Sequence, residues 1–326
     1  MNRFPLLRVG LALVLHCVVH LQAQPDPFAH QATIVTTTGK VYRGWLDGYR
    51  DDRVRLRIAA DRGEAIYQFA PDEIRSLVFP DADRAEEVMT PAESITDDHV
   101  LAILEEVWAG RAAYLPALDR ANRGPLLAYA EGLLKAGRPM EAIARARRMS
   151  GLDLDESETE RMATVLLLGY EAAGLHEEAA ILAENWCRKH RPSGPSVIGW
   201  AVLVRQGLRD QNWESVLWLG LHPVAFGCDA GAIGLDHCYA AVISASLETD
   251  DAATAVTLFN EMQERGIEWP EGEPLFAETL RLIETALRPE TPPEEPALDE
   301  EPVGPPIPDP WLTLEAVRRV LAQPGS

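Results

Sequence analysis

The sequence predicts a chain that is α+β by domains: a small five-stranded β-barrel, an all-α solenoid of helical hairpins and a disordered Pro/Glu-rich tail. Residues 31–80 alternate apolar and polar side chains with the period of two that is typical of strands. From residue 97 the apolar period lengthens to 3.6, and similar segments recur along the chain. Residues 289–310 contain nine prolines and seven acidic residues, a composition that prevents a packed core.

Residues 1–24 are predicted to be a secretory signal peptide. Arg3 and Arg8 precede an apolar stretch from Val9 to Leu21, and Ala23 suits the last position before cleavage. Cys17 would suit a lipid anchor, but the bulky His16 stands where lipidation needs a small residue. Because no other run of 18 apolar residues follows, we expect no membrane span. The expected location is therefore exported, in the periplasm or outside a bacterial cell.

The charge balance disfavours nucleic acid as a partner. The chain has 326 residues, with 51 Asp and Glu against 30 Lys and Arg, for a formal net charge of −21. Nucleic-acid binding needs clustered Lys and Arg to neutralise phosphates. Anionic membrane surfaces also repel such an acidic chain. We therefore expect neither nucleic acid nor a membrane as a partner.

The β-module is expected over residues 31–80. Predicted strands cover residues 32–36, 41–46, 54–58, 65–69 and 77–79, with a helical turn at 71–74. Gly44 and Gly48 are expected to bend the second strand.

The apolar and glycine positions of this module resemble those of small Sm-like or SH3-like β-barrels found in exported bacterial proteins. The matching positions are Thr37, Lys40, Tyr42, Gly44, Leu46, Val54, Leu56, Ile74, Leu77 and Phe79. Sm-like barrels of the cytosol often bind RNA, which the predicted export and the acidic chain oppose. The local arginines are interpreted as a solvated strand face that nearby aspartates offset. The arginines are Arg50, Arg53, Arg55 and Arg57, and the aspartates are Asp47, Asp51 and Asp52.

The helical region repeats itself at a nearly constant period. Aligning the segments on Ala142, Ala179, Val216 and Ala255 gives spacings of 37, 37 and 39 residues. In each segment a first helix ends at a turn, and a small residue in the second helix allows close packing. The region 97–288 resembles tetratricopeptide-like (TPR-like) repeats, whose hairpins stack into a superhelix. The third unit departs from this pattern, because Gln211 and Asn212 replace the turn glycine.

The fourth unit, from Tyr239 to Ile267, resembles a pentatricopeptide repeat. That family binds single-stranded RNA through consecutive repeats. A single match in an acidic, exported chain cannot form such an array. We interpret the likeness as shared packing of helical hairpins.

The C-terminal residues are expected to form a tethered helix. Residues 289–310 are predicted to be an extended acidic, Pro-rich linker, and residues 311–323 a short amphipathic helix that begins at Asp309-Pro310. The apolar positions that could dock into a groove are Trp311, Leu314, Val317 and Leu321. Docking could occur on this chain or on a partner, and a frayed end without a role is the other interpretation.

Catalytic and metal-binding patterns are missing from the sequence. It contains no G-x-S-x-G, no phosphate-binding G-x-x-x-x-G-K-[ST] and no G-x-G-x-x-G. His176-Glu177-Glu178 begins like a zinc-protease helix, but Ala180 stands where the second His is needed. We therefore expect no enzyme, no catalytic residues, no cofactor and no metal.

Cys228 and Cys238 flank a Gly-rich loop and leave three alternatives open. An oxidising compartment favours a disulfide between them. Two buried thiols, or a Cys/His metal site with His222 and His237, are the other interpretations. Cys187 is expected to pack beside its neighbour Trp186 within a helix.

Two functions fit these features. The first is an exported, non-enzymatic scaffold that binds a protein or peptide through a TPR-like groove. The alternative is an envelope-assembly or polymer-handling accessory that acts through the β-module, with the solenoid as a spacer. Trp200, Trp213 and Trp218 either fill the core of the third unit or serve as binding anchors in the groove. The partner, the groove residues and the oligomeric state do not follow from the sequence.

Overall fold

The chain forms two compact units, residues 1–158 (unit 1) and residues 159–326 (unit 2). The computed structural model describes residues 31–60, 63–89, 98–190, 197–226, 228–270 and 272–287. The predicted signal peptide, linker and C-terminal helix lie outside the described residues. No helix in the described part is long and apolar enough to cross a bilayer.

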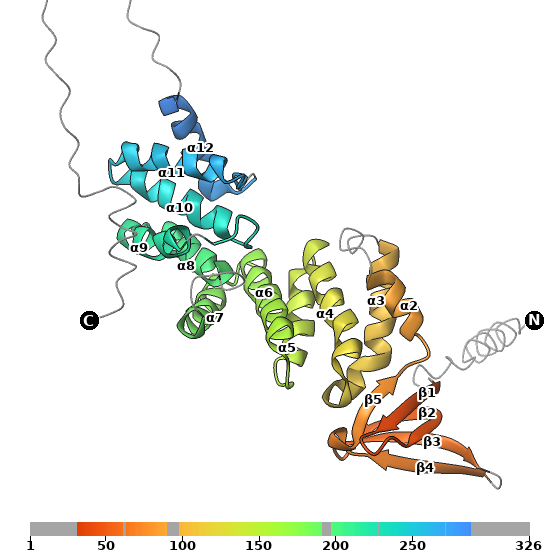
Figure 1. Ribbon diagram of the computed structural model, residues 1–326. Coiled ribbons are helices and arrows are strands. Elements are labelled where there is room, and N and C mark those ends of the chain that lie inside the picture. The colour runs from red at the N-terminus through yellow and green to blue at the C-terminus, as the bar shows by residue number, and fades with distance from the viewer. Residues whose placement is uncertain are drawn as a thin grey trace, which may run out of the picture. The chain divides into compact units, whose positions relative to one another are not determined.

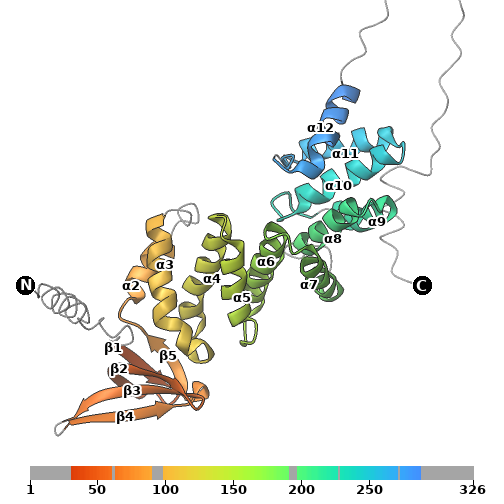
Figure 2. The same cartoon turned by 180° about the vertical axis from the view of Figure 1, so that it is seen from behind.

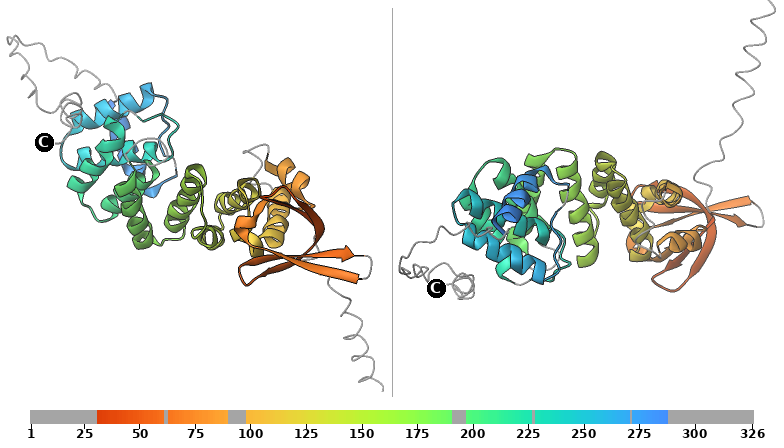
Figure 3. Two further views of the ribbon diagram at one scale, coloured as in Figure 1. Left: turned by 60° about the horizontal axis from the view of Figure 1, so that its bottom comes forward. Right: turned by 90° about the horizontal axis from the view of Figure 1, so that it is seen from above.

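Unit 1 begins with a five-stranded antiparallel sheet, as the alternation of residues 31–80 predicts (Figure 1). The strands are β1 (Gln31–Thr36), β2 (Val41–Arg50), β3 (Arg53–Ala60), β4 (Gly63–Phe69) and β5 (Ile74–Val78). Their order across the sheet is β4-β3-β2-β1-β5. A short 3-10 helix, η1 (Pro71–Glu73), joins β4 to β5. The strands curve strongly (Figure 3), and the sheet contributes fully buried residues such as Ile34, Leu56 and Leu77.

The predicted barrel is wrong, because the sheet is open. The edge strands β4 and β5 do not pair in the described residues. A helical segment, η3 (Ala112–Ala117), packs against β2 and η1 instead. Tyr114 of η3 is buried, accepts a hydrogen bond from the Gly48 amide at 3.0 Å, and contacts the Phe79 ring. Because these helical side chains cover apolar surface at the sheet, burial there does not require β4 to meet β5.

The basic stripe on β3 is neutralised locally, in line with its interpretation as an offset strand face. Asp47 lies 3.4 Å from Arg55 and 2.6 Å from Arg57. The hydrogen bond from Arg57 is the largest influence on Asp47 and holds the pKa of that carboxyl below its ordinary value. Arg53 pairs with Glu73. Most of this stripe is therefore engaged with carboxylates of β2 and of η1.

Four further helices of unit 1 follow the sheet. They are α2 (Ala82–Met89), α3 (Asp98–Arg111), α4 (Arg120–Lys135) and α5 (Pro139–Met149). Consecutive helices α3, α4 and α5 pack against one another. The side-chain amide of Asn122 on α4 donates to the Leu77 carbonyl at 2.6 Å and so ties α4 to β5. The sheet and these helices thus form one packed unit.

Unit 2 is helical throughout its described part. Its helices are α6 (Glu156–Ala172, whose first three residues belong to unit 1), α7 (His176–Lys189), α8 (Val197–Arg209), α9 (Trp213–Ala225), α10 (Leu235–Glu248), α11 (Ala252–Glu264) and α12 (Pro274–Leu287). Helix α10 packs against α8, α9, α11 and α12, and its central place is visible from both sides (Figures 1 and 2). Its segment from Cys238 to Ala245 is buried almost without interruption. This helix is the core of unit 2.

Four helix ends share one turn geometry, at the period found in the sequence. Gly137, Gly174, Gln211 and Asp250 have positive φ values of 72°, 72°, 55° and 60°. After each of them, the next amide donates to the carbonyl five residues earlier, at 2.8–2.9 Å. This is the Schellman ending of an α-helix. Gln211 and Asp250 therefore adopt the left-handed conformation that glycine takes in the first two units, and the turn forms in the third and fourth units without a glycine.

The four aligned small residues occupy the tight positions that the repeat predicts. Ala142, Ala179, Val216 and Ala255 are all fully buried. A side-chain carbon at Gly207 on α8 would stand 2.8 Å from the Val216 side chain on α9, so those helices approach closely. An antiparallel sheet followed by helices with recurring turns is compatible with a helical repeat domain.

Candidate functional site

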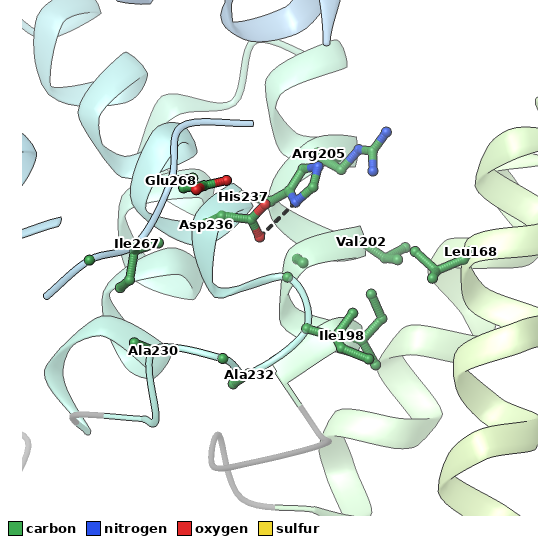
Figure 4. A pocket seen from close by; sticks show the side chains of 15 residues that line it. Leu168, Ile198, Val202, Arg205, Ala230, Ala232, Asp236, His237, Ile267 and Glu268 are labelled. Carbon is green, nitrogen blue, oxygen red and sulfur yellow. Dashed lines mark hydrogen bonds and ion pairs between the residues drawn. The ribbon is translucent and has the colours of Figure 1, made fainter. Parts of the chain in front are cut away.

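The site is a cavity of about 450 Å³ in unit 2. Its lining comes from α6, α8, the first turn of α10, the loop before α10 and the segment after α11 (Figure 4). This volume falls within the range of small-molecule and peptide side-chain pockets. The cavity combines an apolar wall with a charged lip, and these features determine what it can bind.

The apolar wall is built mainly by α6 and α8. Leu168, Ile198 and Val202 lie together on one side of the cavity (Figure 4). Ile198 and Val202 are four residues apart, so they share a helix face. Ile233 belongs to the loop before α10, and its side chain is 55% exposed although it lines the cavity. The wall can therefore receive aliphatic side chains from outside.

The charged lip stands opposite this wall. Asp236 and His237 come from the first turn of α10, and Glu268 follows α11 (Figure 4). The Oδ1 atom of Asp236 lies 3.0 Å from His237 Nδ1. Burial, the largest single influence, would raise the pKa of Asp236, but the side-chain hydrogen bond and charge of His237 together with backbone hydrogen bonds outweigh it and lower that pKa. Glu268 is exposed and has no ion-pair partner among the residues that the structure describes.

An ion-pair network centred on Arg205, which itself lines the cavity, supports this site. Arg205 on α8 places Nε 3.2 Å from Glu171 on α6, and its Nη2 donates to Glu273 at 3.0 and 3.1 Å. Glu273 also lies 3.5 Å from His237 Nε2. Two acids thus hold the guanidinium of Arg205, so its charge is compensated inside the protein. The remaining charge of the lip, on Asp236 and Glu268, is negative.

Glu171 is the most buried acid of this network, with 3% of its side chain exposed. Arg209 donates to both of its oxygens, at 3.1 and 2.5 Å, and His176 Nδ1 lies at 3.3 Å. Burial alone would raise the pKa of Glu171, but the hydrogen bond from Arg209 and the charges of both arginines outweigh it. The pKa of Glu171 therefore lies below its ordinary value. The carboxylate stays ionised and fixes α6 to α8.

A second cavity, of about 610 Å³, adjoins the first. The two cavities share Asp236, Ile267 and Glu268 in their linings. The second cavity adds aromatic side chains, because Trp269 lines it together with Phe259, whose ring centre lies 5.8 Å away. A cation gains from both carboxylates and aromatic faces. The carboxylates of Asp236 and Glu268 therefore mark a place suited to a positively charged group.

The described residues contain no group of three or more His, Cys, Asp or Glu side chains arranged to hold a metal ion. What this arrangement can do chemically is bind a group that is apolar at one end and cationic at the other.

The predicted cysteine pair lies next to this cavity but is not joined in the structure. Cys228 and Cys238 carry thiols and are both buried in the core cluster around α10. Burial, with a smaller contribution from Asp236 and Cys228, raises the pKa of Cys238 well above its ordinary value. Arg265 donates to the Cys228 carbonyl and so holds the loop before α10. The disulfide between the two cysteines stays a prediction.

The tryptophans of the third unit are divided between core and surface. Trp200 and Trp213 are half-buried beside the core of unit 2, whereas Trp218 on α9 is 63% exposed. The ring of His222 stacks on Trp200 at 5.0 Å and meets Trp218 edge-on at 4.8 Å. None of the three lines the cavity. The predicted docking residues Trp311, Leu314, Val317 and Leu321 lie outside the described residues.

Sequence reasoning missed the charged residues of this site. Glu171, Arg205, Asp236 and Glu268 are far apart along the chain, and each has the appearance of an ordinary solvated charge. One signal was available: Arg205 and Arg209 are four residues apart, so they share a face of α8. Nothing in the sequence indicated that Glu171 would be buried opposite that face.

Comparison with known proteins adds no assignment to this site. A scan against protein-family models finds no match to the chain. A search of curated protein sequences finds no significant match either.

Proposed function

We propose that the protein is a non-enzymatic scaffold that binds a peptide segment of a protein partner in the cavity of unit 2. The observation that carries the proposal is the cavity itself, with its apolar wall from α6 and α8 facing the carboxylates of Asp236 and Glu268. A segment with an aliphatic residue next to Lys or Arg complements both surfaces. We further propose that the helices are TPR-like repeats, because four identical turns recur at a period close to that family's.

We also propose that the scaffold is exported, on the basis of its sequence. The signal-like residues 1–24 would place the scaffold in the periplasm or outside the cell. Its partner would then be another exported protein or the exposed part of an envelope protein.

Selection from a random peptide display library on the full chain tests the proposal. Enriched peptides are expected to pair Lys or Arg with aliphatic residues. Replacing Ile233→Ser should weaken their binding at least tenfold, because Ile233 exposes apolar surface inside the cavity. Ile181→Ser is the matched control, since Ile181 on α7 is 56% exposed and lies outside the cavity.

Two charge-reversal variants test the contribution of the charged lip to peptide binding. Glu268→Lys should weaken the selected peptides, whereas Glu264→Lys should not, because Glu264 is an exposed acid of α11 outside the cavity. Selection of no peptide at all, or equal binding by all four variants, would contradict the proposal.

The alternative function, through the sheet of unit 1, is favoured by a separate observation. Trp45 on β2 and Ile66 on β4 are 39% and 49% exposed. Each pairs with Arg57 on β3, so all three lie in one line across the outer face of the sheet. A Trp45→Ala, Ile66→Ser double variant that loses a polymer or envelope ligand while keeping peptide binding would favour this function.

A further inference from the structure

The C-terminal segment of this chain is a candidate occupant of the cavity. This inference rests on the proposed function and names a ligand for the same cavity. The cavity needs apolar side chains on one side and a cation on the other. In this acidic chain, a segment that offers both and is attached to unit 2 is a natural candidate.

The sequence of residues 311–323 has the required pattern. Leu314, Arg318 and Leu321 follow at spacings of four and three, so a helix would present all three on one face. A cation between two leucines is unfavourable on a plain apolar stripe. It matches a surface on which carboxylates stand beside an aliphatic wall. Arg319 falls on a different face of the same helix, roughly 100° further around it.

The chain length permits this contact. Helix α12 ends at Leu287, within unit 2. The segment from residue 288 to residue 310 spans at most about 80 Å when fully extended. That reach exceeds the size of a helical unit such as this one, about 30 Å across. A tether of this length also keeps the segment at an effective concentration near the millimolar range.

We propose that residues 311–323 occupy the cavity of unit 2 in the same molecule and compete there with the partner peptide. Arg318 lies between Asp236 and Glu268, and Leu314 and Leu321 contact the wall that includes Val202 and Ile233. The partner peptide must displace this segment, so residues 311–323 lower the apparent affinity of the cavity for the partner.

The test measures binding of a labelled synthetic peptide of residues 309–326 to the full chain by fluorescence anisotropy. Arg318→Glu in the chain should raise the affinity for the added wild-type peptide at least tenfold, because the internal competitor is weakened. Arg319→Glu is the matched control and should leave the affinity at the wild-type value. In the Arg318→Glu chain, Glu268→Lys should then remove the gain, and Glu264→Lys should not.

Equal peptide binding by the wild-type, Arg318→Glu and Arg319→Glu chains would overturn the inference. Dimerisation of the wild-type chain that Arg318→Glu abolishes, seen by sedimentation, would also overturn it, because the segment would then dock on a second copy. If peptides selected from the library bind the Arg318→Glu chain but the tail peptide does not, the inference fails and the proposed function stands. If neither binds, both fail.

Discussion

At the residue scale, Glu171 connects the packing of unit 2 to its site. This acid of α6 forms ion pairs with Arg205 and Arg209 of α8. Arg205 also pairs with Glu273, and Glu273 lies close to His237 at the lip. Removing one partner of a buried ion pair leaves uncompensated charge, which costs more than an exposed pair contributes. The network therefore fixes the wall and the lip of the cavity with respect to each other.

Glu171→Gln should lower the free energy of unfolding at pH 7 by on the order of 3 kcal/mol. The pKa of Glu171 is lowered in the folded state, so its contribution is present above the pKa of the unfolded chain, about 4.3. That contribution is lost as pH falls through the lower folded pKa. Urea unfolding from pH 7 to pH 3 should show the difference between variant and wild type shrinking.

The control for Glu171 is Glu178→Gln on α7, an exposed acid, which should change stability by less than about 0.5 kcal/mol. A difference between Glu171→Gln and wild type that stays constant down to pH 3 would show that the carboxylate charge is not what stabilises the contact.

The buried thiols give a second prediction at this scale. Burial raises the pKa of Cys187 to about 12 and raises that of Cys238 well above its ordinary value. Thiolate is the form that reacts with alkylating agents. Iodoacetamide at pH 8 should therefore leave both cysteines unmodified in the native protein and modify them in guanidinium, as peptide mass mapping would show. Fast labelling of native Cys187 would contradict this burial.

The same peptide map decides whether Cys228 and Cys238 are joined. Prepared without reductant from exported protein, the map shows either a linked peptide or two separate thiol peptides. The linked form is expected if the oxidising compartment acts on this pair.

At the element scale, the recurring helix ending leads us to expect opposite changes in stability when its left-handed residue is replaced in two of the units. Gln211 has a φ of 55° at the position where Gly174 has 72°. A side chain in the left-handed region costs about 1 kcal/mol, which glycine avoids. Gln211→Gly should therefore stabilise unit 2 by about 0.5–1 kcal/mol.

Gly174→Ala is the reciprocal change and should destabilise by about 1 kcal/mol. A side-chain carbon there would meet no atom within 4 Å, so backbone strain alone is tested. Both effects are measured by urea unfolding followed by far-ultraviolet circular dichroism. Changes of the same sign in the two variants would show that the turns are not equivalent.

Local signals predicted the elements well. The alternation of residues 31–80 predicted five strands, and the recurring turns and small residues predicted the hairpins. Ala142, Ala179, Val216 and Ala255 are all buried as aligned. These signals succeed because period and turn chemistry are set by neighbouring residues.

Closure of the sheet could not be predicted in the same way. Tyr114, which contacts Gly48 and Phe79 at the open sheet, lies 36 residues beyond the end of β5 at Val78. The charged site was hidden for the same reason, because Glu171 and Glu273 meet Arg205 only after the helices pack. Contacts between distant residues carry no periodic signature in one sequence.

At the scale of the whole molecule, the acidic residues behind the net charge of −21 have different roles in the two units. In unit 1 carboxylates engage most of the basic stripe, whereas in unit 2 the charge of Glu268 stays available at a cavity. Binding of a basic peptide there should weaken as salt rises from 0.05 to 0.5 M, because exposed charges are screened. A salt-independent affinity would assign the binding to the apolar wall alone.

The most direct measurement of the central claim is site-specific photo-crosslinking with a library-selected peptide. A photoreactive residue is placed at position 233, which lines the cavity, or at position 181, which is equally exposed on α7 outside it. We expect the peptide to crosslink from position 233 and not from position 181, and we expect Glu268→Lys to remove the adduct. Crosslinking from position 181 alone, or equally from both, would contradict it.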